Sequence, residues 1–193
     1  MKFDYEYGQT MLSPEEADWL KIPAKTKAEL NAFEARNIAK AKEYYISKSI
    51  KLSTMLSESF ICEVHKRMYW DVWKWAWTFR KSDKNIWVPY YKIWIDLKSL
   101  LQDVDYWINK TNMSEIEICI RFKHRLVAIH PFPNWNWRFS RLMCDLMYKK
   151  VFWKPWFTWW KSFKENEWRN FYIKSLKKAD WMAYDDLIYF ITH

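Results

Sequence analysis

Apolar residues recur every three or four positions through most of this sequence, which is the pattern of helices that each bury one face. Residues 1–25 are polar instead, and they predict an irregular arm with one short helix that begins at Ser13. We therefore expect an all-α protein, with an N-terminal arm and helix over residues 1–56 and a larger helical domain over residues 57–193. The predicted helices span residues 26–45, 57–70, 97–108, 115–128, 138–150, 162–178 and 182–192.

The stretch from Phe79 to Leu97 departs from the helical pattern. A turn cluster at residues 82–85 is flanked by β-branched and aromatic residues, which favour extended structure. We predict a small β-hairpin or extended flap here. After it, His130 precedes Pro131, and this order disfavours helical backbone at the histidine and predicts the end of a helix.

Glycine and tryptophan are used abnormally, in opposite directions. The 193 residues include 1 Gly and 16 Trp, whereas average usage predicts about 13 Gly. The codon UGA encodes Gly in some bacterial lineages and Trp in others, so translation with the wrong table would write Trp at UGA-encoded glycines. We interpret many of the written tryptophans in this way, and the alternative is a protein that truly carries them. The tryptophans that stand where turns and helix ends favour Gly are Trp19, Trp70, Trp77, Trp87, Trp153, Trp160 and Trp181, whereas Trp73, Trp75, Trp107 and Trp159 stand in aromatic or amphipathic company.

Charge and hydropathy exclude some classes of protein. The net charge of +9 allows an acidic or nucleic-acid partner but requires neither, because Lys spread along helices usually forms a solvated face. No stretch approaches the roughly 20 apolar residues of a membrane span, and residues 1–10 lack the apolar centre of a signal peptide. We expect a cytoplasmic protein without a membrane partner. Three widely spaced cysteines, Cys62, Cys119 and Cys144, are expected to be small buried side chains.

The residues that carry chemistry lie together at positions 130–141, which read HPFPNWNWRFSR. With glycines in place of its two tryptophans, this segment is a loop that enters a helix N-terminus, where backbone N–H groups and the helix dipole favour anions. Arg138 and Arg141 share one face of the first helical turn and can bind phosphate oxygens. His130 can take a proton from an attacking hydroxyl near neutral pH. The segment therefore predicts a polyphosphate cradle with a general base.

Two asparagines and the two tryptophans complete this cradle. Asn134 can offer a neutral oxygen to a hydrated Mg²⁺ that bridges phosphates. Asn136 can donate its side-chain amide to a phosphate oxygen or cap the helix. Trp135 and Trp137 stand where the backbone needs glycine to take positive φ and to approach phosphate closely. As written, their indoles should fill the cradle and weaken or prevent ATP binding.

This segment resembles the signature of the Fic family, within the wider Fic/Doc (Fido) group, which runs His-Pro-Phe, one residue, Asp or Glu, Gly-Asn-Gly-Arg, two residues, Arg. Residues 12–193 also resemble the small Fic proteins called mobile mystery protein B, in stretches such as LSPEEAD and AELNAFEARNI. The departures are Asn134, where an acidic residue is usual, and the tryptophans at 135 and 137. The resemblance implies an all-α Fic fold with a β-hairpin flap.

The resemblance also implies a protein adenylyltransferase (AMPylase), which transfers AMP from ATP to a Ser, Thr or Tyr hydroxyl of a target protein with Mg²⁺ as cofactor. His130 would be the base and Asn134 the metal ligand. Asn136 and the backbone of residues 135–137 would form the anion hole, and Arg138 and Arg141 would contact the β- and γ-phosphates. The flap would align the target segment by strand addition through Lys84, Asn85, Ile86, Val88, Tyr90 and Tyr91.

Regulation is less clearly marked. Many Fic proteins are held inactive by a helix that carries a glutamate, and Glu29 and Glu34 lie in the helix predicted after Thr26. Neither has the family's spacing, so we favour capping and surface roles and keep inhibition as the alternative. The resemblance leaves open an antitoxin or other inhibitory partner.

Alternative functions also stay open. Indoles in the cradle would favour a catalytically inactive Fic-fold module or a basic module that binds protein or nucleic acid, although nucleic acid is the weaker expectation. A Doc-like protein kinase is a further alternative, but Doc-type loops carry Lys in place of the second Gly. The order Asn136, position 137, Arg138 therefore favours AMP transfer.

Overall fold

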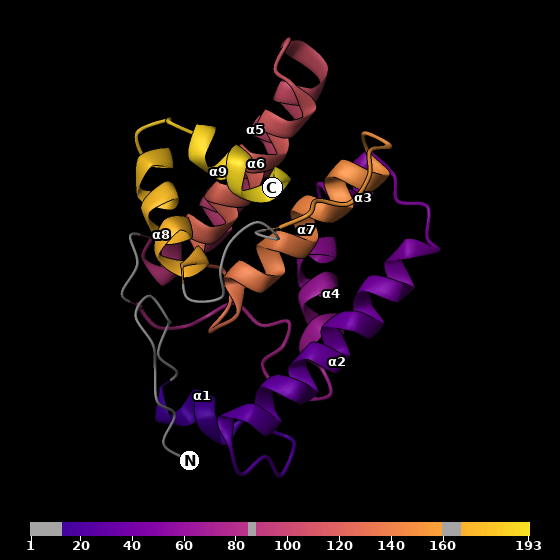
Figure 1. Cartoon of the computed structure of the whole chain (residues 1–193). Helices are drawn as coiled ribbons and strands as arrows, with labels where there is room; N and C mark the ends of the chain where they lie inside the picture. Colours follow the sequence, from indigo (N-terminus) through magenta and orange to yellow (C-terminus); the bar gives the residue numbers. More distant parts are fainter. Residues whose placement is uncertain (1–12, 85–87, 160–166) are drawn as a thin grey trace.

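The computed structural model describes residues 13–84, 88–159 and 167–193, and within these ranges the chain is all-α (Figure 1). An isolated β-bridge joins Leu20 to Trp73, and these ranges contain no other extended pairing. The predicted fold class is therefore confirmed. The elements are α1 (Pro14–Asp18), α2 (Lys27–Ile46), α3 (Leu52–Met55), α4 (Glu58–Tyr69), the 3₁₀ turn η1 (Tyr90–Lys92), α5 (Ile93–Lys110), α6 (Glu115–Ile129), α7 (Asn136–Lys150), α8 (Trp168–Ala179) and α9 (Asp185–Thr192).

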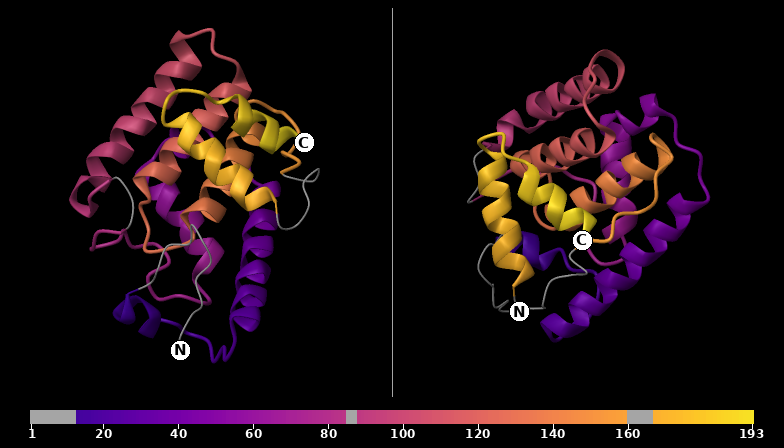
Figure 2. Two further views of the ribbon diagram at one scale, coloured as in Figure 1. Left: turned by 60° about the vertical axis from the view of Figure 1, so that its left-hand side comes forward. Right: turned by 45° about the horizontal axis from the view of Figure 1, so that its top comes forward.

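The helices α6 and α7 pack against each other at the centre of the molecule (Figure 2). The helices α5 and α9 lie against α6, and α4 lies against α7. The long helix α2 packs on α4, and α8 pairs with α9. The loop that joins α6 to α7 is the 130–135 segment, so the helical core holds both ends of the predicted cradle.

Side-chain caps explain where several helices begin. Ser13 and Thr26 each accept a hydrogen bond from the N–H three residues later, and Glu16 and Glu29 return a bond to the cap backbone. These two capping boxes start α1 and α2 where the sequence predicts helices. The helix α3 is short, and its apolar positions are too few to be recognised as a helical repeat.

The region after Phe79 differs from the sequence-based expectation. Helical structure begins at Tyr90 and α5 at Ile93, earlier than the predicted start at Leu97. The reason is burial: Ile93, Leu97 and Leu100 recur at helical spacing and are each 1% exposed or less.

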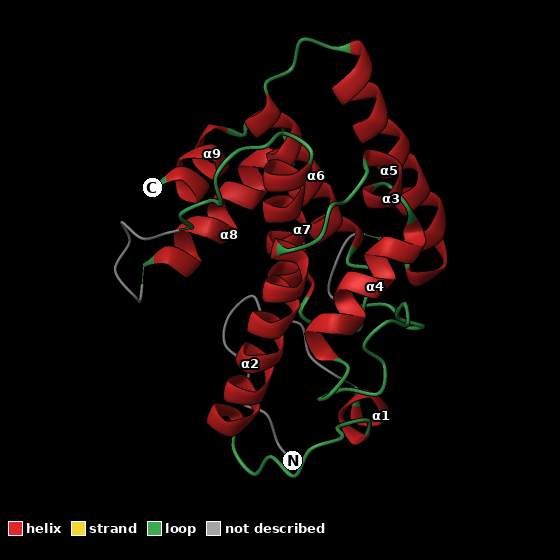
Figure 3. Ribbon diagram, turned by 90° about the vertical axis from the view of Figure 1, so that its right-hand side faces the viewer, coloured by secondary structure: helices red, strands yellow, loops and turns green. Residues whose placement is uncertain are grey.

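The predicted β-hairpin is not seen on the described flap residues, because residues 79–84 and 88–89 contain no strand. Asn85 and Ile86 lie outside the described residues. The described loop after α4 instead lies beside α1, where the Trp75 indole donates to the Glu16 carbonyl at 3.1 Å (Figure 3).

Helix ends differ in three other places. The helix α7 begins two residues before the predicted Arg138, α9 begins at Asp185 rather than at position 182, and α8 begins at Trp168. Residues 160–166, which include most of the predicted start of α8, lie outside the described residues. The helix α4 ends at Tyr69, close to the predicted end at position 70, but the backbone of Trp70 is α-helical (φ −51°) and does not require glycine.

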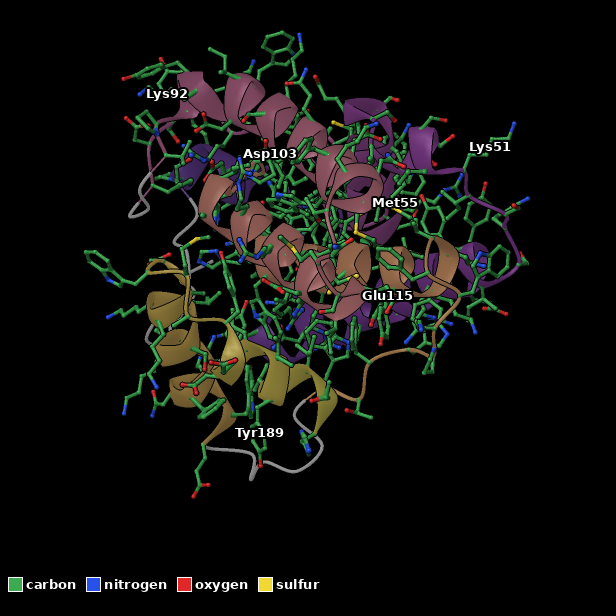
Figure 4. The ribbon with its side chains drawn as sticks, turned by 90° about the horizontal axis from the view of Figure 1, so that it is seen from above. Lys51, Met55, Lys92, Asp103, Glu115 and Tyr189 are labelled. Atoms are coloured by element: carbon green, nitrogen blue, oxygen red, sulfur yellow. The ribbon has the colours of Figure 1, made fainter. Side chains whose placement is uncertain are left out.

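The core is formed where α4, α6 and α7 meet. Met55 lies within the dense centre of side chains and is fully buried, whereas Lys51 lies at the outer edge and is exposed (Figure 4). Cys119 and Cys144 are buried, as predicted, and Cys62 is partly buried. Among the described residues, no helix combines the length and the apolar character that crossing a bilayer requires.

Candidate active site

The loop of the predicted cradle starts with a sharp reversal at His130. This residue takes left-handed backbone (φ 51°, ψ 60°), while its N–H still donates to the Leu126 carbonyl at 3.1 Å. The following residue is Pro131, which disfavours helical backbone at the histidine. His130 therefore lies at the point where α6 ends and the loop begins, as the sequence predicts.

The loop ends at Trp135, which is the N-cap of α7 and also has left-handed backbone (φ 61°, ψ 17°). The first intrahelical hydrogen bond runs from the Phe139 N–H to the Trp135 carbonyl at 3.0 Å. The backbone N–H groups of residues 136–138 precede that bond at the helix N-terminus, where the dipole favours negative charge. Positive φ therefore occurs at position 135 as expected for glycine, but position 137 is helical and needs glycine only for close approach.

Asn136 fixes the shape of the loop from within. Its Oδ1 accepts a hydrogen bond from the Phe132 N–H at 3.0 Å, and its Nδ2 donates to the carbonyls of Phe132 and Asn134 at 2.8 and 3.3 Å. The residue is 1% exposed. Asn136 Nδ2 therefore donates within the loop, so the backbone rather than this side chain would supply the donors for an anion.

Asn134 is buried, and its Oδ1 accepts a hydrogen bond from the Trp135 N–H at 2.7 Å. An amide oxygen carries two lone pairs and can accept more than one partner. In the described parts of the chain, no group of three or more His, Cys, Asp or Glu residues could hold a metal by itself. A magnesium ion would therefore depend on Asn134 together with phosphate and water oxygens.

The two arginines of the first turns have different surroundings. The Nη1 of Arg138 lies 3.1 Å from Oε2 of Glu34, and the Arg138 side chain is 33% exposed. The guanidinium of Arg141 lies 5.3 Å from the ring centre of Trp137 and 5.0 Å from that of Trp159. Burial lowers the pKa of Arg141 to about 10, so it stays charged at neutral pH.

Glu34 reaches this site from α2 and is fully buried. Its Oε1 accepts a hydrogen bond from the Trp73 indole at 2.9 Å, and the Trp135 indole lies beside the same carboxylate. Burial raises the pKa of Glu34 to about 7, although the contacts with Trp73 and Arg138 oppose that rise. The favoured surface role is therefore wrong for Glu34, because one face of α2 is buried against the centre of the molecule. Glu29 is an exposed capping residue and does not reach the site.

His130 is 7% exposed. Burial lowers its pKa to about 3, and the positive charges of Arg80 and Lys84 act in the same direction. Its imidazole is therefore neutral at physiological pH and able to accept a proton, but it is a weaker base than the unshifted imidazole expected from the sequence.

Two buried residues that sequence reasoning missed contact the loop at Phe132 and at the His130 carbonyl. His65 is fully buried, stacks on Phe132 with ring centres 3.7 Å apart, and bonds through Nδ1 to the Ala76 carbonyl. Arg80 is 2% exposed and donates to the carbonyl of His130 at 2.8 Å. No periodic pattern marks Arg80, because it lies in a loop, and His65 reads as an ordinary core position of α4.

The described flap residues make contacts with α1, with Arg80 and with Asp83. Lys84 forms a largely buried ion pair with Glu16 of α1, and the Val88 carbonyl accepts a hydrogen bond from Arg80. The N–H of Tyr90 donates to Asp83 at 2.8 Å. The side chains of Tyr90 and Tyr91 are exposed.

The tryptophans fall into two classes that match the sequence interpretation in part. Trp73 and Trp75 are buried, and their indoles donate hydrogen bonds to Glu34 and to the Glu16 carbonyl. Trp153 and Trp181 are 83% and 88% exposed. Among the described residues with a side chain, Trp135, Trp153 and Trp159 supply three of the five positive φ values. Trp159 does so although it is buried and stands in aromatic company in the sequence, so the two classes do not separate there. Left-handed backbone and exposed indoles are the expected signature of glycine positions.

Comparison with known proteins agrees with this site. Residues 55–148, which contain the complete loop and nearly all of α7, match the family model described as Fic/DOC family. No curated protein sequence matches the chain.

Solved Fic proteins share the fold. BepC, a VirB-translocated effector of Bartonella tribocorum solved with bound AMPPNP, has a TM-score of 0.67 at 14% identity, with 94% of this chain and 99% of that chain covered. The N-terminal Fic domain of a Bep effector from Bartonella quintana, solved with bound ADP, has a TM-score of 0.67 at 17% identity, with 90% and 89% covered.

Fic-1 from C. elegans has a TM-score of 0.65 at 21% identity, and the match covers 89% of this chain and 49% of that chain. The matched sequence segment holds the histidine, the loop and both arginines of the site. Residues 55–148 of this chain therefore match the Fic/DOC family, and the chain shares the fold of solved Fic proteins.

Proposed function

We propose that this protein is an adenylyltransferase that transfers AMP from ATP to a Ser, Thr or Tyr hydroxyl of a target protein. The observation that carries the proposal is the joining of a buried neutral imidazole to a helix N-terminus by one short loop. His130 begins this loop, and Arg138 and Arg141 lie just beyond its end. A base and an anion site joined by one short loop suit the attack of a hydroxyl on a bound polyphosphate.

In the proposed reaction, His130 accepts the proton of the target hydroxyl as the oxygen forms a bond with the α-phosphorus. The bond between the α-phosphorus and the oxygen that bridges to the β-phosphate breaks, and pyrophosphate leaves. The neutral state of His130 at physiological pH supports this role, because a protonated imidazole could not accept the proton. The N-terminus of α7 would stabilise charge on the phosphates.

The nucleotide would be held by the backbone of residues 135–137 together with Arg138 and Arg141. Binding of AMPPNP by BepC and of ADP by the Bartonella quintana domain supports a nucleotide for this family member. Asn134 would ligate Mg²⁺, which neutralises phosphate charge when it is bound. The flap residues Lys84, Val88, Tyr90 and Tyr91, with Asn85 and Ile86, would align the target segment.

We also propose that Glu34 inhibits the enzyme. Its carboxylate is paired with Arg138, the arginine that a phosphate would need, and the two groups compete for the same guanidinium. An antitoxin, a cytoplasmic location and the likeness to mobile mystery protein B stay predictions from the sequence.

A second candidate function is a catalytically inactive Fic-fold module. The observation that favours it is the position of the written indoles, since Trp135 lies beside Glu34 and Arg138, and Trp137 lies against Arg141. If both tryptophans are real, they occupy space that a phosphate needs.

Labelled ATP separates these functions. The chain that carries Trp135→Gly and Trp137→Gly is incubated with Mg²⁺ and with soluble protein from the cells that naturally express it. Label from the α-phosphate on protein supports AMP transfer, label from the γ-phosphate indicates a Doc-like kinase, and no label from either favours the inactive module. The chain as written serves as the matched control.

A further inference from the structure

The guanidinium of Arg80 lies between the candidate base and the flap. Arg80 is 2% exposed, and its Nε donates to the His130 carbonyl at 2.8 Å. Its Nη2 donates to the Val88 carbonyl and lies 3.4 Å from the Ile129 carbonyl. Its Nη1 donates to the Ser82 carbonyl at 3.0 Å. One buried side chain thus bonds to the end of α6 and to both sides of the flap.

The backbone of Arg80 makes a further connection, because its N–H donates to the Pro131 carbonyl at 2.9 Å. His130 needs such support, since left-handed backbone is unfavourable for a residue with a side chain. Only arginine offers five donors in one rigid plane, so a lysine at this position could not bind these carbonyls together.

We propose that Arg80 is a positioning residue, which fixes the flap relative to His130 through the backbone carbonyls of both. This proposal rests on the proposed roles of His130 and the flap, but it concerns a physical coupling that exists with or without catalysis. A target segment aligned on the flap is then held at a set distance from the base. Arg80 is buried and its guanidinium bonds to backbone carbonyls, so the contribution we assign to it is geometric.

Amide exchange and histidine spectra test the coupling without any substrate. The variants are Arg80→Lys, which keeps the charge but not the fork, and Arg80→Gln, which loses both. The matched control is Arg125→Gln, which removes an arginine of α6 that pairs with Asp103 away from the flap. In both Arg80 variants we expect exchange at the Tyr90 amide to rise at least about tenfold, as for a lost charge-assisted hydrogen bond. The His130 ring signal, among the 4 histidines of the chain, should move in both and stay unchanged in the control.

A double-mutant cycle makes the test specific to Arg80. Asp83→Ala loosens the flap from its exposed side, because Asp83 accepts the Tyr90 N–H and lies 3.8 Å from Arg80. We expect Asp83→Ala to move the His130 ring signal when Arg80 is present. It should have no such effect when Arg80→Gln is already present. An unchanged His130 signal in Asp83→Ala, or equal effects in both backgrounds, would overturn the proposal.

Failure of the variants to fold has its own outcome. If Arg80→Gln does not fold, Arg80→Lys and Asp83→Ala still decide the matter, because Asp83 is exposed and its loss should leave the core intact. The Tyr90 exchange rate and the His130 ring signal are measured without substrate, so they do not depend on AMP transfer. A chain that transfers no AMP can still show the coupling, and the two failures are therefore distinguishable.

Discussion

Glu34 in α2 and Arg138 in α7 form an ion pair of 3.1 Å although 104 residues separate them in sequence. The carboxylate is fully buried and the guanidinium is partly exposed. A nucleotide phosphate at the N-terminus of α7 would therefore compete with Glu34 for Arg138. This relationship gives the first two predictions.

Replacing Glu34 with Gln should release Arg138 and increase nucleotide affinity by about tenfold, because it removes a buried charge that competes for a partly exposed guanidinium. Calorimetric titration with ADP, in a chain that carries Trp135→Gly and Trp137→Gly, measures the change. Glu29→Gln is the matched control, because Glu29 is exposed and far from Arg138. Equal affinities for Glu34→Gln and Glu29→Gln would show that Glu34 does not compete.

Stability should respond to the same carboxyl group as pH changes. The folded pKa of Glu34, about 7, lies above the ordinary value of 4.5, so its contribution is fully present below pH 4.5 and is lost as pH rises through 7. The free energy of unfolding of Glu34→Gln, minus that of the unsubstituted chain, should therefore be larger at pH 8 than at pH 5. The expected increase is on the order of 2–3 kcal/mol. Urea unfolding at both pH values checks this difference. A gap between variant and natural chain that does not change with pH would contradict the assigned pKa.

The loop should depend on Asn136 for its shape. Asn136→Ala removes three hydrogen bonds inside a buried loop, so we expect a loss of about 2–3 kcal/mol in the free energy of unfolding. Thermal unfolding measures it, with Asn109→Ala as the control, because Asn109 is exposed and bonds only within its own helix. A loss no larger than that of Asn109→Ala would mean that these contacts do not hold the loop.

Asn134 makes a separate prediction for magnesium. A carboxylate at this position carries charge that the amide lacks, so Asn134→Asp should lower the Mg²⁺ concentration needed for half-maximal transfer. A Mg²⁺ titration of label transfer measures the shift. Identical titrations for the two chains would count against Asn134 as the ligand.

The glycine interpretation predicts the residues that the natural protein contains. Peptide masses across residues 125–141, from protein isolated from its native cells, should show Gly at positions 135 and 137. The left-handed backbone of Trp135 supports this expectation. Trp at both positions would leave a Fic fold without room for phosphate and would favour a binding role.

Most helices were predictable because their apolar faces and caps are local signals. Thr26 with Glu29 begins a helix through hydrogen bonds, and Pro131 ends one because it disfavours helical backbone at His130. The start of α5 at Ile93 was missed because β-branched and aromatic residues near the flap favour strands when taken alone, whereas burial against α6 makes them helical.

The site was only partly predictable for a related reason. The histidine, the loop and the arginines lie within twelve residues, so their chemistry is visible in the sequence. Glu34 and Arg80 act on that loop from 104 and 50 residues away. Such contacts depend on how α2 and the flap pack, and the lowered pKa of His130 depends on burial that no local pattern reports.

Transfer of the α-label from ATP is the measurement that tests the proposed function most directly. The chain with Trp135→Gly, Trp137→Gly and Glu34→Gln is compared with the same chain carrying His130→Ala as well, after both are shown to be folded. The proposed mechanism predicts α-labelled protein with the first chain and a loss of at least about a hundredfold with the second. Equal labelling by the two chains, or no α-label with the first, would contradict it.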